Sequence, residues 1–185
     1  MKPRLLCSGL LILLMCSFSA HAADAKAEAE KLAAEYFEAS RALDWAKASS
    51  YMHPEALAAF QRIMGMVVES DPSGEAGRQM LGLSEGQSFK DLTPPQTFQR
   101  LMGSLMEQVP MMKDLMASSR FAILGTLTEG ELIHVVYRIN MGSEDGSMSK
   151  VAIVTWKRDG AVLKALLTAD MEGTLSKLAQ SVRNK

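Results

Sequence analysis

Alternation of apolar with polar residues over positions 120–169 is the feature that most constrains what this chain can fold into. In the clearest stretch the odd-numbered positions from 133 to 139 are all apolar, whereas the even-numbered ones include His134 and Arg138. A period of two residues is that of a β-strand with two different faces. Turn residues recur between the apolar stretches, so hairpins join successive strands. The segment predicts an antiparallel four-stranded meander with strands over about residues 120–128, 131–141, 148–157 and 161–169.

The part of the chain before residue 118 has helical periodicity instead. Apolar residues recur at steps of three and four over about residues 25–43, and again after Pro54, which suits the first position of a helix. The sequence Thr93-Pro94-Pro95-Gln96 is a capping box followed by prolines and predicts the start of a third helix. Pro110 lacks an amide donor, so we expect it to kink or restart that helix and leave a short piece through Met116.

Two other segments complete the predicted fold. Residues 70–92 are rich in glycine and predict a long surface excursion with a helical turn around Gln79 to Leu81. Residues 173–182 predict a short last helix. Because the helices precede the strands, the fold class is α+β, with N-terminal helices packed on the meander and a short C-terminal helix.

Residues 1–22 have the three parts of a secretory signal peptide. Lys2 and Arg4 give a basic start, an apolar run covers Leu5 to Met15, and Ala20-His21-Ala22 is a small-x-small cleavage site. The run is shorter than the roughly 20 residues that a membrane span needs, so we expect no stable membrane span. A lipoprotein signal ending at Cys16 is the alternative. Cleavage after Ala22 predicts a periplasmic or secreted protein whose single domain covers residues 23–185.

Composition excludes several functional classes. Both cysteines, Cys7 and Cys16, lie in the predicted signal peptide, so the mature chain has no thiol nucleophile, disulfide or thiolate metal site. A net charge of −1 gives no basic field for nucleic acid. Sequence patterns of serine hydrolases, NTPases and dinucleotide-binding proteins are missing from the chain. We predict no nucleic-acid partner, no metal site and no cofactor.

Three local features accompany the order of helices followed by a meander: Leu43-Asp44-Trp45-Ala46-Lys47 after the first helix, Met52-His53-Pro54-Glu55, and the Asp159-Gly160 hairpin. In these respects the chain resembles the nuclear transport factor 2-like (ketosteroid-isomerase-like) cone-fold superfamily across roughly residues 25–182. The resemblance implies a curved sheet that takes helices into its concave side, a pocket at its wide mouth, and homodimerisation through the sheet as one arrangement. Its members include isomerases, dehydratases and non-catalytic binding modules.

The candidate ligand site is an apolar pocket edged by Tyr36, Tyr137, His134 and Arg138. The last two lie four residues apart on one strand, where they can hold a carboxylate or sulfate, or else belong to the solvated outside of the sheet. In the isomerase branch the resemblance implies a tyrosine and a protonated carboxylic acid in an oxyanion hole. This chain offers only Asp170 at a strand end and Asp44 in a loop, so no catalytic residue is assigned.

Methionine is the unusual component of the composition, at 14 residues. Met102 and Met106, and likewise Met112 and Met116, are one helical turn apart, which suits either Cu(I) ligation by thioethers or adaptable apolar packing. We interpret the protein as an exported, non-catalytic binding or interaction module for a small hydrophobic ligand or a protein partner. A small lyase or isomerase and a Cu(I)-handling protein are the alternatives.

Overall fold

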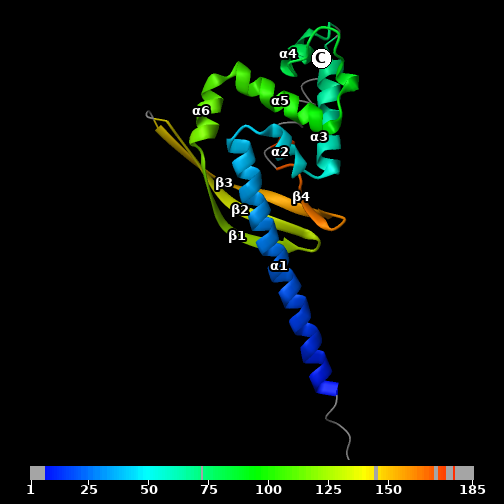
Figure 1. Cartoon of the computed structure of the whole chain (residues 1–185), viewed down its shortest axis with the longest axis vertical. Coiled ribbons are helices and arrows are strands. Elements are labelled where there is room, and N and C mark those ends of the chain that lie inside the picture. The colour runs from blue at the N-terminus through cyan, green and yellow to red at the C-terminus, as the bar shows by residue number, and fades with distance from the viewer. Residues whose placement is uncertain (1–6, 72, 144–145, 169–170, 174–176, 178–185) are drawn as a thin grey trace, which may run out of the picture.

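The computed structural model describes residues 7–71, 73–143, 146–168, 171–173 and 177 (Figure 1). Helices come first and strands second, so the predicted α+β class is confirmed. The elements in chain order are α1 (Cys7–Arg41), α2 (Trp45–Ser50), α3 (Pro54–Glu69), α4 (Glu75–Met80), the 3-10 helix η1 (Phe89–Asp91), α5 (Pro94–Gln108), α6 (Pro110–Ser118), β1 (Arg120–Glu129), β2 (Leu132–Ser143), β3 (Gly146–Asp159) and β4 (Val162–Ala165).

The sheet is the predicted meander. Its strands pair in the order β1-β2-β3-β4, each antiparallel to its neighbour, and the sheet is curved and open. Gly130 and Gly160 turn two of the hairpins with positive φ angles of 58° and 61°, a conformation that favours glycine. The last strand is shorter than expected and ends at Ala165, where Met52 forms a parallel bridge with it. The chain then leaves the sheet, and Leu167 is buried among the helices.

The first helix is longer than the periodicity predicted. It runs without interruption through the predicted cleavage site at Ala22, and Figure 1 shows its N-terminal half extending beyond the sheet while the C-terminal half crosses the sheet. Among the described residues, no helix is both long enough and apolar enough to span a membrane. The predicted last helix over 173–182 lies mostly outside the described residues, although residues 171–173 are helical.

One core lies between α1 and the sheet. Ala29 and Ala33 are fully buried, and their small side chains let the helix approach the strands closely. One turn further on, the ring of Phe37 stacks on Phe121 of β1, with centroids 4.2 Å apart and planes 3° from parallel. It also lies 4.4 Å from the ring of Tyr137 on β2. We call the face of the sheet that α1 covers the inner face.

A second core joins α2, α3 and α5. Trp45, Phe60 and Phe98 meet edge to face in it, with ring centroids 5.6 to 6.4 Å apart. The predicted starts of α3 and α5 are confirmed at Pro54 and Pro94, and α6 restarts at Pro110 as expected. Helix α2 was not predicted, because six residues are too few for a clear periodicity.

Candidate interaction surface

The face of the sheet opposite α1 presents an apolar band to solvent, and we call it the outer face. The strand register assigns to it three cross-strand rows: Leu127-His134-Thr155, Gly125-Val136-Ile153 and Ala122-Arg138-Val151. Leu127 is 62% exposed, Val151 51% and Ile153 49%. These three side chains and Val136 occupy neighbouring positions across the rows. They form one apolar band on a face whose centre no described helix covers.

A polar cluster interrupts the band on β2. Nδ1 of His134 lies 3.0 Å from the hydroxyl oxygen of Thr155 on β3, within hydrogen-bonding distance. Its Nε2 lies 3.3 Å from a carboxylate oxygen of Glu129, at ion-pair distance but without hydrogen-bond geometry. The imidazole side chain is only 19% exposed although it stands on the outer face. Its neighbours on the adjacent strands therefore hold His134 in place.

Opposite charges mark the two ends of the outer face. Glu129 closes β1 at the end that holds the β1–β2 hairpin, and its side chain is 82% exposed. Arg120 opens β1 at the other end, and Arg138 lies one row nearer the centre. Neither arginine has an ion-pair partner among the described residues. Along β1, the outer face thus has a carboxylate at one end and a guanidinium at the other.

The four residues predicted to edge one pocket do not form a single site. Tyr137 is buried on the inner face, where α1 covers it, whereas His134 and Arg138 lie on the outer face. Tyr36, on α1, packs 5.7 Å from Phe37, ring centroid to centroid, and burial raises the pKa of its phenol. The structure therefore places Tyr137 on one face of the sheet and His134 and Arg138 on the other, rather than around one pocket. The alternation of a β-strand separates positions 134 and 138 from position 137 by the thickness of the sheet.

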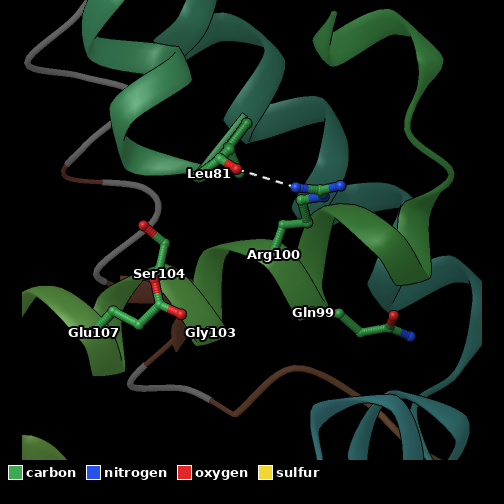
Figure 2. Close-up of a pocket in the computed structure, with 7 residues that line it drawn as sticks. Leu81, Gln99, Arg100, Gly103, Ser104 and Glu107 are labelled. Atoms are coloured by element: carbon green, nitrogen blue, oxygen red, sulfur yellow. Dashed lines mark hydrogen bonds between the residues drawn. The ribbon is translucent and has the colours of Figure 1, made fainter. Parts of the chain in front are cut away.

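Aromatic rings fill the middle of the space between α1 and the inner face. The described surface hollows are open, and a hollow of about 530 Å³ lies between α1 and the hairpin end of the inner face, lined by residues that include Ala25, Ile133 and Leu163. One of about 410 Å³ is lined by residues that include Trp45, Met106 and Lys113, between α2 and the α5–α6 junction. Another of about 270 Å³ along α5 is polar, and in it Arg100 donates a hydrogen bond to the carbonyl of Gly82 at 3.0 Å (Figure 2). None of these three hollows includes any of the four predicted pocket residues.

Some residues were candidates for catalysis or for Cu(I) ligation. Where the structure describes these residues, they have structural roles. Asp44 caps α2 by accepting a hydrogen bond from the amide of Lys47 at 2.9 Å, while Asp170 lies outside the described residues. Met106 is buried in the helical core, and Met102, Met112 and Met116 pack against that core. Among the described residues there is no cluster of three His, Cys, Asp or Glu side chains arranged to hold a metal. These contacts favour apolar packing as the role of the methionines.

The apolar residues of the outer face were not identified from the sequence as a site, although the sequence carries a signal for them. Residues 151–154 of β3 are Val-Ala-Ile-Val, an unbroken apolar run where a strand with one solvated face would alternate. A run of this kind is typical of a strand that is covered on both faces. Within the described chain only the inner face of β3 is covered.

Comparison with known proteins yields no relative that would assign a function. No family model, no curated protein and no solved structure matches the chain.

Proposed function

We propose that this protein is an exported, non-catalytic interaction module that binds another protein through the outer face of its sheet. The observation that carries the proposal is the apolar band in which Leu127, Val151 and Ile153 are exposed and the half-buried Val136 lies between them. Contiguous apolar surface of this kind marks interaction sites more often than ordinary solvated surface does. Export is supported by the signal-like residues 1–22.

The shape of the surface favours a macromolecule over a small ligand. Small-molecule sites are concave and bury most of the ligand, whereas the outer face is a sheet of three long strands and one short one. On the inner side, Phe37, Phe121 and Tyr137 fill the space between α1 and the middle of the sheet, and the hollow of about 530 Å³ at the hairpin end is open and is not lined by these rings. An apolar surface of a partner protein suits the outer face, where it would shield the apolar side chains that water now contacts.

Polar β-branched substitutions test the proposal. Replacing Val151 and Ile153 together by threonine keeps β-branching, and hence strand propensity, but places hydroxyl groups in the band. We expect partner binding to weaken at least tenfold while the midpoint of urea unfolding stays nearly unchanged, because both side chains are half exposed. A loss of binding that accompanies unfolding would not support the proposal.

Site-specific photocrosslinking in the native host supplies the binding readout. A benzophenone amino acid at Leu127 should form covalent adducts with protein, and the double threonine variant should reduce them. The same probe at Met111 of α6, which is 67% exposed, is the matched control and should form none. Equal labelling at the two positions, or no protein adduct at Leu127, would overturn the assignment of the outer face.

A further inference from the structure

The last strand of the sheet lies beside only one end of its neighbour. Strand β3 has 14 residues, but β4 pairs with it only from Trp156 to Asp159, and the chain leaves the sheet after Ala165. Figure 1 shows β4 beside one end of β3, while the rest of β3 runs on toward its hairpin with β2. Within the described chain, no strand pairs with residues 147–154 on this side. These residues therefore form a second free edge of the sheet, in addition to β1.

The direction of the backbone groups along this edge follows from a contact at its end. Leu166 donates its amide hydrogen to the carbonyl of Thr155 at 2.7 Å, so the backbone groups of Thr155 face the β4 side. Backbone groups alternate in direction along a strand, and those of Ile153, Val151 and Ser149 therefore face the same side. All three of these residues are exposed. The free edge thus presents a row of amide donors and carbonyl acceptors.

This edge lacks the features that protect β1. A bulge between Ile123 and Gly125 interrupts the register of β1, and the hydroxyl of Thr126 donates a hydrogen bond to Glu30 of α1. The register of β3 with β2 is continuous, and residues 151–154 include no charge and no proline. An unprotected edge of this kind is a template for pairing with another chain.

We propose that the partner of the outer face adds an extended segment as a fifth strand along residues 147–154 of β3. This inference rests on the proposed function and names the kind of segment that binds. The segment runs antiparallel to β3, in line with β4, because antiparallel pairing is the more stable kind and joins the other strands of this sheet. In strand addition of this type, main-chain hydrogen bonds supply affinity and alternate side chains supply specificity.

The side chains beside the free edge indicate the chemistry of the segment. On the outer face Val151 and Ile153 have Arg138 and Val136 of β2 as cross-strand neighbours, and no described strand flanks them on the other side. They are 51% and 49% exposed. Side chains directly opposite each other on paired strands lie about 5 Å apart, so apolar residues of the added strand would cover both. We expect a segment of another protein in which every second residue is apolar.

A second copy of this chain fits the edge less well. Pairing of the odd-numbered residues from 147 to 153 with their own copies in reverse has its two-fold axis at Lys150. The two Lys150 side chains would then stand directly opposite each other, and like charges in that position destabilise a strand pair. A segment of another protein is free of this constraint.

Proline substitution tests the edge separately from the face. Val151→Pro removes an amide donor of the free edge but keeps an apolar side chain, and edge strands tolerate proline where the N–H faces solvent. A benzophenone amino acid at Ser149 gives the readout, by photocrosslinking in the native host. We expect Val151→Pro to reduce the adduct with the partner protein at least tenfold while the midpoint of urea unfolding stays nearly unchanged.

Thr128→Pro is the matched control at the other edge. Thr128 is exposed and precedes Glu129, which pairs with Leu132 beside the two-residue turn of the β1–β2 hairpin. The amide of Thr128 therefore faces the free edge of β1. This variant makes the same backbone change away from β3 and should leave the adduct at Ser149 unchanged.

Amide hydrogen exchange of the unsubstituted protein supplies a measurement that does not depend on how the variants fold. The partner identified from the adduct should slow exchange at Val151 and Ile153 at least tenfold and leave Thr128 unaffected. Unchanged exchange at Val151 and Ile153 in the complex would overturn the added strand.

The outcomes separate this inference from the proposed function. An adduct that survives Val151→Pro but is lost when Val151 and Ile153 are both replaced by threonine overturns strand addition and keeps binding through the outer face. Absence of protein adducts at both Leu127 and Ser149 overturns both. Mass spectrometry of the adduct identifies the crosslinked segment. A segment of this same chain, or one without apolar residues at alternate positions, refutes the proposed occupant.

Discussion

Replacement of Phe37 by alanine should remove much of the stability of the fold. The ring is 4% exposed and lies within 4.4 Å, centroid to centroid, of two other rings, those of Phe121 and Tyr137. A fully buried phenylalanine shields about 150–200 Å² of surface, and at about 25 cal/mol per Å² the part lost on truncation to alanine is worth about 3 kcal/mol. The cavity and the lost ring contacts bring the expected cost to about 3–5 kcal/mol. Domains of this kind have about 5–15 kcal/mol in all.

Urea unfolding followed by tryptophan fluorescence measures this cost. The two tryptophans report on different cores, since Trp156 is buried under α1 and Trp45 is buried among the helices. A Trp45→Phe background therefore isolates the signal from the sheet core. In that background Phe37→Leu is the control: it keeps most of the apolar volume and should cost about 1–1.5 kcal/mol. A loss below about 1 kcal/mol for Phe37→Ala, with an unchanged dependence on urea, would show that the aromatic cluster does not hold α1 on the sheet.

Three further predictions concern single contacts. Burial raises the pKa of Tyr36, so the neutral phenol is favoured in the folded state. The stability that this neutral phenol contributes is complete below about pH 10, the pKa of the unfolded chain, and is lost as the pH rises above it. A Tyr36→Phe variant should therefore lose less stability between pH 9 and 11 in thermal melts. The hydrogen bond from Lys157 to Glu55, at 2.9 Å, lowers the pKa of that carboxyl below 4.5. The small contribution of this hydrogen bond to the free energy of unfolding is therefore present above that pH and is lost as the pH falls. Glu55→Gln should reduce the decrease in stability between about pH 5 and 3. Asp44→Ala should cost about 1 kcal/mol in urea unfolding by removing the cap of α2, whereas Asp44→Ser should cost much less.

The sheet was predictable because its signals are local. Turn residues and the two-residue period gave the four strands, and the same period placed Tyr137 on the face opposite His134 and Arg138. The prediction of one pocket for all of these residues came from the resemblance to a hollow cone. The filling of that hollow depends on Phe37 reaching Phe121, which is 84 positions further along the chain. A contact of that range leaves no local pattern to read.

Helix α2 and the end of β4 were missed for a related reason. The six residues of α2 are defined by the Asp44 cap and by packing of Trp45 against Phe98 of α5, and neither produces a periodic pattern within so short a segment. The last strand ends at Ala165, whose amide and carbonyl groups hydrogen-bond to the backbone of residues 51–53. The apolar residues that follow β4 predict a longer strand, although Leu167 already packs among the helices.

Strand propensity is the competing explanation for apolar residues on the outer face. Val151 and Ile153 are β-branched, and such residues favour strands even where solvent reaches them. That reasoning does not extend to Leu127, which is not β-branched and is the most exposed of the three at 62%. Nor does propensity explain why Ile153 of the unbroken apolar run 151–154 lies beside Val136 of β2, next to the row that holds Leu127. Burial against a partner accounts for both observations, because it requires apolar surface of any shape, gathered on one face.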